Sequence, residues 1–229
     1  MKKTIVISLG GSLIIPDKPN TKFLVQFVKT LRKHYSTHKF VVVCGGGSIA
    51  RKYISALKAE NKSKRELANA GIRATRMNAQ FIMQMFTKKE VNDFLPLNMK
   101  QVKNALKKNN VVICGALRFS PNSTSDSTAA KLAHYLKTEF INLTNVAGLY
   151  DKDPKKYKDA KFIPLSTWEE FNAKVSKIKF SHGQNFILDQ KASEIIKKHR
   201  IKTYLLGSDL KNFSNALAEK KFTGTIIEK

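Results

Sequence analysis

Short, almost wholly apolar runs recur along this chain, and each is followed by a segment in which apolar residues return every three or four positions. A continuous apolar run that glycine or polar residues end is typical of a strand buried on both faces. We therefore predict strands at Ile5–Leu9, Phe40–Cys44, Val111–Cys114, Phe140–Leu143 and Thr203–Leu206.

The amphipathic segments between these runs predict helices. In one of them, Ile49, Tyr53, Ile54 and Leu57 are expected to share one face. Ser166–Glu169 reads as a capping box that starts a short helix. Further helices are predicted at Thr21–His34, Gly71–Phe86, Ser125–Lys137, Asp189–His199 and Asp209–Glu219. This alternation favours a mostly parallel sheet with helices on both faces, which binds ligands at the carboxyl ends of its strands.

Length and composition fit one α/β core. The chain has 229 residues, of which 42% are apolar, so a second domain is not required. No apolar run approaches the roughly 20 residues of a membrane-spanning helix. The start, MKKTIVISLGGSLI, reads as the first buried strand of a cytoplasmic protein and not as a signal peptide. Cys44 and Cys114 each end a strand and are expected to pack in the core, without a metal motif.

A net charge of +25 admits two interpretations, a nucleic-acid binder or an enzyme of anionic small molecules with a lysine-rich surface. The lysines are scattered along the whole chain and do not form one arm or tail. Zinc-finger spacing, aromatic RNA-binding signatures and a basic helix with heptads are all missing from the sequence. A solvated basic surface is therefore favoured, and nucleic acid is an unlikely main partner.

Two glycine-rich turns, SLGGS and CGGGS, each link a predicted strand to a helix. Gly45, Gly47 and Ala50 fit a variant dinucleotide-binding fingerprint, but no acidic residue ends a strand about twenty positions later. The phosphate-loop pattern of common NTPases is missing as well. Both turns can present backbone N–H groups to phosphates. The alternative is a pair of tight turns without a ligand.

Two further segments carry polar side chains where strands end. Ser120–Leu136 gathers hydroxyl and amide donors ahead of a helix, and Asp126 in its first turn could orient a metal or a lysine. Hydroxyls of this segment could bind a phosphate. Leu143–Pro154 places Tyr150 beside Asn and Asp side chains, which is a plausible purine shelf, although surface loops often look the same.

Taken in order, these stretches resemble the amino acid kinase family and, within it, the archaeal-type uridylate (UMP) kinases. The resemblance rests on VISLGGSLI, VVVCGGGSIARKYI, GIRATRMNAQFIMQ, STSDSTAAKLAHYL, INLTNVAGLYDKDPKK, GQNFILDQKASEII and GTIIEK, which together span essentially the whole chain. It implies a three-layer αβα sandwich around a mainly parallel sheet, formed by a single domain over 1–229. It also implies the reaction UMP + ATP → UDP + ADP with Mg²⁺, in pyrimidine nucleotide biosynthesis, and a hexamer in the cytoplasm.

The resemblance also implies two halves with separate ligands. The acceptor-binding part would cover about 1–140 and the ATP-binding part about 141–229. Residues implied to contact ATP are Gly10, Gly11, Ser12, Gly47, Arg51, Thr144, Asn145, Tyr150 and Asp153. Residues implied to contact UMP are Gly46, Pro121, Asn122, Ser123, Thr124 and Ser125. Asp126, Arg51 and Asp189 would be catalytic, and no metal site made by the protein alone is expected.

Several positions depart from the family pattern. Ser8 and Ser48 stand where many members carry lysine, and Ala68 stands where an acidic residue would hold the UMP ribose. Ala147 replaces an aspartate, and the acceptor loop inserts Arg118 and Phe119. Two alternatives therefore stay open: the same fold acting on another phosphate or carboxylate acceptor, and a non-catalytic nucleotide-binding regulator.

Overall fold

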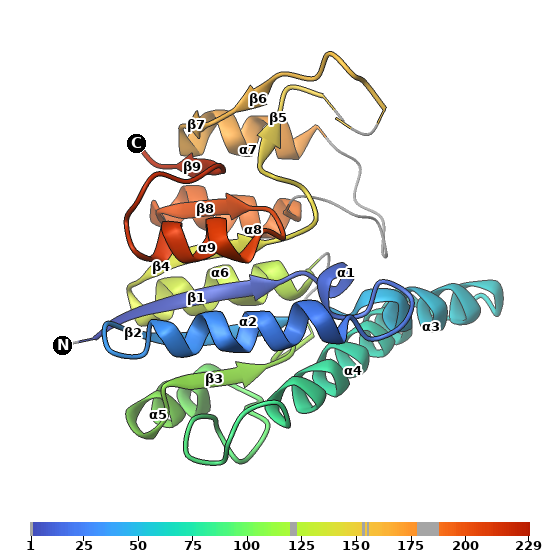
Figure 1. The fold of residues 1–229 in the computed structure, drawn as a ribbon. Coiled ribbons are helices and arrows are strands. Elements are labelled where there is room, and N and C mark those ends of the chain that lie inside the picture. Colours follow the sequence, from blue (N-terminus) through green and yellow to red (C-terminus); the bar gives the residue numbers. More distant parts are fainter. Residues whose placement is uncertain (1, 120–122, 153, 155, 178–187) are drawn as a thin grey trace.

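The computed structural model describes residues 2–119, 123–152, 154, 156–177 and 188–229. Within them, a seven-stranded sheet has the order β3-β2-β1-β4-β8-β9-β7 (Figure 1). The strands are β1 (Lys3–Leu9), β2 (His38–Cys44), β3 (Val111–Cys114), β4 (Glu139–Leu143), β7 (Leu165–Ser166), β8 (Thr203–Leu206) and β9 (Thr225–Ile227). All neighbouring pairs are parallel except β8 and β9, which confirms the predicted mainly parallel sheet.

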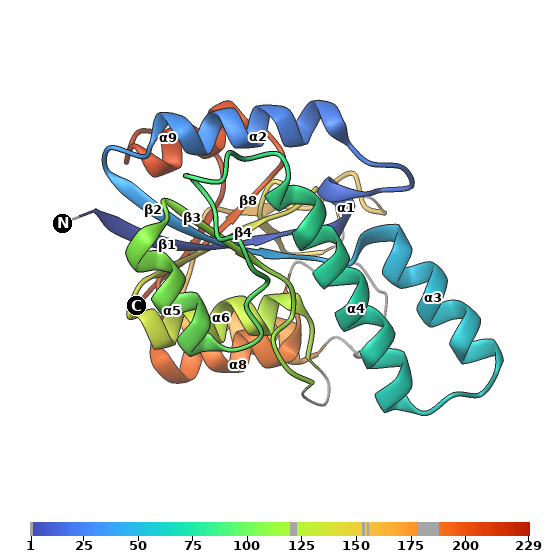
Figure 2. The same cartoon turned by 90° about the horizontal axis from the view of Figure 1, so that it is seen from below.

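Helices cover both faces of this sheet, as Figure 2 shows, so the three-layer αβα architecture is confirmed. On one face lie α2 (Thr21–Lys33), α4 (Lys64–Met83) and α9 (Leu210–Leu217). On the other lie α5 (Met99–Lys108), α6 (Ser125–Leu136), α7 (Trp168–Ser176) and α8 (Gln190–His199). The remaining elements are α1 (Gly11–Ile14), α3 (Gly47–Ala59) and a small antiparallel pair, β5 (Leu149–Tyr150) with β6 (Phe162–Ile163).

The core has two parts, one on each face of the sheet. Along β1, Ile5 and Ile7 belong to the part under α2 and α9, whereas Val6 belongs to the part under α6 and α8. Val41 and Val42 of β2 divide in the same way. Successive side chains of a strand point to opposite faces, so a strand covered on both sides must be apolar at every position. This explains why the central strands are uninterrupted apolar runs.

Some boundaries differ from those predicted. Helix α4 begins at Lys64 and not near Gly71, because Ser63 and Glu66 form a capping box. The capping box of α7 is made by Thr167 and Glu170, one residue later than the predicted Ser166–Glu169 box. The prediction for Tyr53 was also wrong, since its side chain is 56% exposed while Ile54 is buried. In the described part of the chain, no helix is long and apolar enough to cross a membrane.

Candidate active site

The two glycine-rich turns interlock at the carboxyl ends of β1 and β2. The N–H of Gly45 donates to the Leu9 carbonyl at 2.9 Å, which brings the second turn against the first. A Cβ atom on Gly11 would lie 2.1 Å from the backbone nitrogen of Gly47, and one on Gly45 would lie 2.4 Å from that of Gly11. Real side chains do not approach so closely, so the contact requires bare backbone on both sides. The glycines therefore have a packing role even before any ligand is considered.

Gly47 turns the chain into α3. Its φ of +62° lies in the left-handed region, and a Cβ there would come within 2.5 Å of the Ile15 side chain. The next residue, Ser48, is buried, and its N–H donates to the Ile15 carbonyl while its hydroxyl donates to the Asp17 carbonyl. Ser48 thus fixes the start of α3 to the loop after α1, and its hydroxyl is directed at that loop.

Asp126 lies in the first turn of α6, partly buried, with its carboxyl group at the end of β1. The Ser8 hydroxyl donates to its Oδ1 at 2.5 Å. Burial is the main reason that the pKa of Asp126 rises to about 7, and the nearby Asp189 carboxylate raises it further. Ser8 is itself fully buried, and its hydroxyl is directed at the Asp126 carboxyl group.

Asp189 connects α8 to the start of α6. It is the N-cap of α8, accepting from the Ala192 N–H at 2.7 Å. Its other oxygen accepts from the Thr124 hydroxyl at 2.5 Å and from the N–H groups of Thr124 and Ser127. Burial raises the pKa of Asp189, while these hydrogen bonds oppose the rise. The geometry therefore makes Asp189 a residue that positions the segment carrying Asp126.

We expect Asp189→Ala to lower the free energy of unfolding by about 2–4 kcal/mol, because it removes a helix cap and leaves several buried donors unpaired. Chemical denaturation at pH 8 would measure the change. Glu194→Ala, at an exposed position of the same helix, is the matched control and should change stability by less than about 0.5 kcal/mol. An Asp189→Ala protein as stable as that control would contradict this role.

The predicted acceptor residues gather at the start of α6. Thr124 is its N-cap and Ser125 its first residue, and both are partly exposed. The Ser123 hydroxyl is buried and has no hydrogen-bond partner within the described residues. A buried hydroxyl without a partner is costly unless a ligand or water satisfies it. Pro121 and Asn122 lie outside the described residues.

Three polar side chains of α4 hold the neighbouring loops, and the sequence analysis did not assign them roles. Arg76 donates to the Ala116 and Leu117 carbonyls at 3.1 and 2.6 Å. Thr75 accepts from the Ala116 N–H at 2.9 Å, and Asn78 donates to the Gly45 carbonyl at 2.8 Å. Helix α4 therefore anchors both the triple-glycine turn and the loop after β3.

The predicted nucleoside residues follow β4. Thr144 lies beside the first glycine turn, since a Cβ on Gly10 would be 3.6 Å from its Cα. Asn145 is exposed next to it. Tyr150 is separated from them by a turn and packs edge-on against Phe162, with ring centroids 5.3 Å apart. Asp153 lies outside the described residues.

Two cations follow the triple glycine. Arg51, one turn into α3 after Gly47, donates from Nη2 to the Pro16 carbonyl at 3.1 Å. Lys52 forms an exposed ion pair with Asp17 at 2.9 Å. Arg51 is thus held near the glycine turns, whereas Lys52 is engaged at the surface.

Comparison with known proteins identifies the family. A model of the amino acid kinase family matches residues 3–207. The chain belongs to the amino acid kinase family. It is 34% identical to a uridylate kinase of Thermoplasma volcanium, across 100% of this chain and 99% of that protein. A crystal structure of uridylate kinase from Archaeoglobus fulgidus is 31% identical, covers 99% of this chain and 100% of its own, and superposes with a TM-score of 0.84.

The family's fold extends to more distant relatives. The structure of a UMP kinase from Bacillus anthracis is 18% identical and superposes with a TM-score of 0.81, covering 99% of this chain and 96% of that one. At that identity the comparison concerns the fold alone. In this amino acid kinase, the interlocked turns and the Asp126 and Asp189 carboxyl groups lie at the carboxyl end of the sheet, where ligands of parallel α/β folds bind.

Proposed function

We propose that this chain is a uridylate kinase, a phosphotransferase that moves the γ-phosphoryl group of ATP to UMP and gives UDP and ADP. The observation that carries the proposal is the pair of interlocked glycine turns together with the Asp126 carboxyl group, which the Ser8 hydroxyl holds at the end of β1. Relatives that match across the whole chain, at 34% and 32% identity, are named uridylate kinases. The names of these relatives favour UMP over another acceptor. The geometry of the turns and of Asp126 favours an enzyme over a regulator without activity.

On the donor side, the ATP phosphates would lie along Gly10, Gly11 and Ser12 of the first turn. The backbone N–H groups of Gly11 and Ser12, where α1 begins, could donate to a phosphate oxygen, while the Gly10 N–H already donates to the Leu143 carbonyl. The nucleoside would lie over the segment after β4, beside Thr144 and Asn145. In this arrangement the ATP-binding part begins near 141, and Tyr150 and Asp153 would lie farther along the same segment.

On the acceptor side, the UMP phosphate would bind at the start of α6. The unpartnered Ser123 hydroxyl and the Thr124 and Ser125 side chains supply donors, as would the amide groups of Asn122, and Pro121 would contact UMP without donating. Gly46 of the second turn would also contact UMP, so that the two phosphates would meet between the turns. The acceptor-binding part would then cover about 1–140.

Phosphoryl transfer needs in-line positioning and neutralisation of charge more than covalent help from the protein. The attacking oxygen of UMP is already anionic, so no general base is required. Arg51 and the N–H groups of Gly47 and the first turn would stabilise the charge on the moving group. Asp126 would organise the transfer centre, and Asp189 would hold the start of α6 in place.

Mg²⁺ fits this centre as an ion bound mainly by ATP. In the described residues, no group of three or more His, Cys, Asp or Glu side chains could hold a metal by itself. Mg²⁺ commonly takes one or two carboxylates together with substrate phosphates and water, and the partly buried Asp126 carboxyl group is suited to that part. When bound, the ion would neutralise charge on the transferred phosphoryl group.

The biological setting is part of the same proposal. A kinase that makes UDP acts in pyrimidine nucleotide biosynthesis, which takes place in the cytoplasm. We also propose that the chain assembles as a homohexamer. Its net charge of +25 fits anionic substrates, and small molecules remain its proposed partners, without nucleic acid or membrane.

The proposal is tested by a coupled ADP-release assay with a panel of acceptors. We expect turnover with UMP and a kcat/KM at least tenfold lower with CMP, with other monophosphates and with acidic metabolites. A higher kcat/KM with another acceptor would overturn the choice of UMP. Measurable ATP binding without turnover of any acceptor would favour the regulator instead.

Arg118→Ala is expected to raise the KM for UMP several-fold and to leave the KM for ATP nearly unchanged. Arg118 is exposed in the loop after β3, close in sequence to the proposed UMP-binding residues. Steady-state kinetics with each substrate varied in turn would measure both constants. Lys108→Ala, at an exposed position before β3, is the control. Equal changes in the two KM values would remove Arg118 from acceptor binding.

A further inference from the structure

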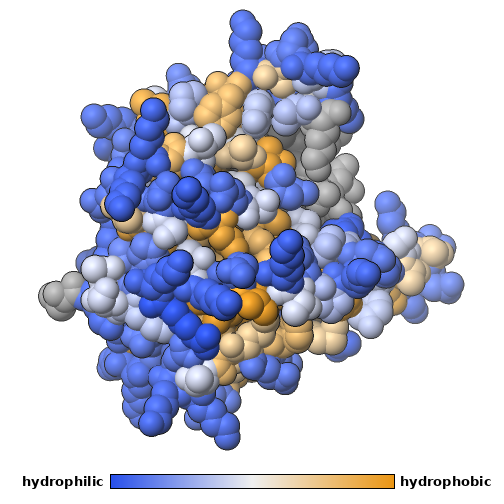
Figure 3. All heavy atoms as spheres, viewed as in Figure 1, coloured by the Kyte–Doolittle hydropathy of each residue, from blue (hydrophilic) through white to orange (hydrophobic). Residues whose placement is uncertain are grey.

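A groove runs between α2 and α9 on the face of the sheet that they share. It encloses about 570 Å³, within the size range of small-molecule sites. Figure 3 shows apolar surface in the middle of this face, between hydrophilic side chains. The groove shares no residue with the candidate active site, and Asp126 packs beneath the opposite face of the sheet.

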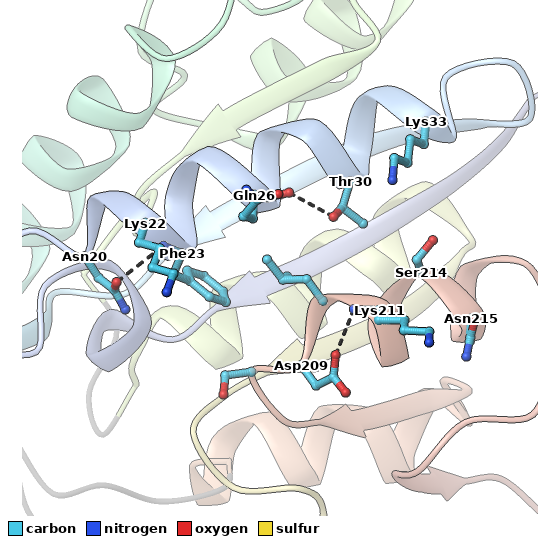
Figure 4. Close-up of a pocket in the computed structure, with 12 residues that line it drawn as sticks. Asn20, Lys22, Phe23, Gln26, Thr30, Lys33, Asp209, Lys211, Ser214 and Asn215 are labelled. Atoms are coloured by element: carbon cyan, nitrogen blue, oxygen red, sulfur yellow. Dashed lines mark hydrogen bonds between the residues drawn. The ribbon is translucent and has the colours of Figure 1, made fainter.

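The lining of the groove is cationic. Lys22 and Lys33 extend from α2 toward α9, and Lys211 extends along α9 (Figure 4). None of the three forms an ion pair with any residue that the structure describes. Asp209 is the one carboxylate among the lining residues, and it accepts from the N–H groups of Lys211 and Asn212. An anion in the groove would be attracted to these lysines.

The two helices begin at the same end of the groove. Asn20 caps α2 by accepting from the Phe23 N–H, and Asp209 caps α9. Both caps line the groove, and Lys22 and Lys211 follow them within the first turn of each helix. Helix N-termini carry a partial positive charge. Two lysines and the two helix starts outweigh the single Asp209 carboxylate that caps α9, so this end is the more favourable place for a phosphate group.

Away from that end the groove offers neutral hydrogen-bonding groups. Gln26 and Asn215 supply amides and Ser214 a hydroxyl, and the partly buried Phe23 ring, beside Lys22 at the start of α2, supplies an apolar surface between them and the phosphate end (Figure 4). Amides and hydroxyls beside an aromatic ring are suited to a sugar, whose hydroxyl groups both donate and accept hydrogen bonds. The far end carries a further cation, Lys33.

We propose that this groove is a second binding site, which takes a phosphorylated sugar, either free or as part of a nucleotide. The phosphate binds between Lys22 and Lys211 at the starts of α2 and α9, and the sugar lies against Gln26, Asn215 and the Phe23 ring. The site does not rest on the proposed kinase function, since none of its groups takes part in that reaction.

The test measures binding while the active site is filled with saturating UMP and a non-hydrolysable ATP analogue. The probes for calorimetry are ribose 5-phosphate and inorganic phosphate. We expect one further equivalent of ribose 5-phosphate to bind, and the double variant Lys22→Gln/Lys211→Gln to weaken that binding about tenfold. Loss of two charge-assisted hydrogen bonds makes a change of this size reasonable.

The matched control is Lys29→Gln/Lys221→Gln, which removes the same charge from exposed positions outside the groove. It should bind ribose 5-phosphate as the unmodified protein does, and both double variants should keep the same melting temperature. Equal loss in the two variants, or no loss in either, would overturn the site. Inorganic phosphate binding as tightly as ribose 5-phosphate would overturn the sugar part of the proposal.

Discussion

Asp126→Asn is expected to lower kcat for phosphoryl transfer about a hundredfold or more and, at the same time, to stabilise the fold at pH 8. The loss follows because the carboxylate is proposed to organise the charges around the moving phosphoryl group, and losing one such electrostatic group typically costs 10²–10³ in rate. Asn keeps the shape and can still accept from Ser8, so the change is confined to charge.

The gain in stability follows from the raised pKa of Asp126. Its pKa is about 7 in the folded protein against an ordinary value of 3.8, so the folded state binds more protons than the unfolded state between these values. Stability is therefore lost as the pH rises through this window, and the full cost is present above about pH 7. Removing the charge should return on the order of 2–4 kcal/mol at pH 8 and little at pH 4.

Urea unfolding of both proteins at pH 4 and pH 8, together with kcat at pH 8, would measure these two effects. Asp93→Asn, which removes an exposed carboxylate, is the control and should change neither. A variant that keeps full kcat would take Asp126 out of the mechanism. A variant less stable at pH 8 than the unmodified protein would contradict the raised pKa of Asp126.

Gly11→Ala is expected to lower the free energy of unfolding by about 3 kcal/mol or more and to abolish activity. The added methyl group would meet the backbone nitrogens of Gly47 and Gly46 at 2.1 and 2.9 Å, so one of the two turns must move. Backbone cannot yield as a flexible side chain does, and overpacking of this kind is strongly destabilising.

Gly71→Ala is the matched control, because it adds the same methyl group inside α4. There the nearest atom is Ile54 Cδ1 at 3.4 Å, an ordinary contact with a flexible side chain. Alanine in a helix interior should stabilise by about 0.5–1 kcal/mol relative to glycine. Thermal and denaturant unfolding would compare the two. If Gly11→Ala were as stable as Gly71→Ala, the interlocked turns would not be required for the fold.

The central strands could be predicted because they are covered on both faces and so are apolar throughout, as in β1 and β2. Other elements lacked such a signal. Helix α5 is short and exposes several lysines, and it escaped the sequence analysis although Asn98 caps it. Strand β9 is only three residues long, and it joins the sheet by pairing antiparallel with β8 and parallel with β7.

The site could be predicted in part. Asp126 and the glycine turns could be predicted because a helix start and a glycine-rich turn each have a recognisable pattern of neighbouring residues. Contacts between segments far apart in sequence have no such local pattern. The Ser8–Asp126 and Thr124–Asp189 hydrogen bonds were therefore seen only in the structure. The roles of the predicted residues in binding ATP and UMP stay predictions.

The most direct test of the account is a transfer experiment with ATP labelled in its γ-phosphoryl group. Incubation of the protein with this ATP, Mg²⁺ and UMP should place the label in the β-phosphate of UDP, and Asp126→Asn should slow its appearance about a hundredfold or more. Label that remains in ATP, or that is released only as inorganic phosphate, would contradict the claim that this chain phosphorylates UMP.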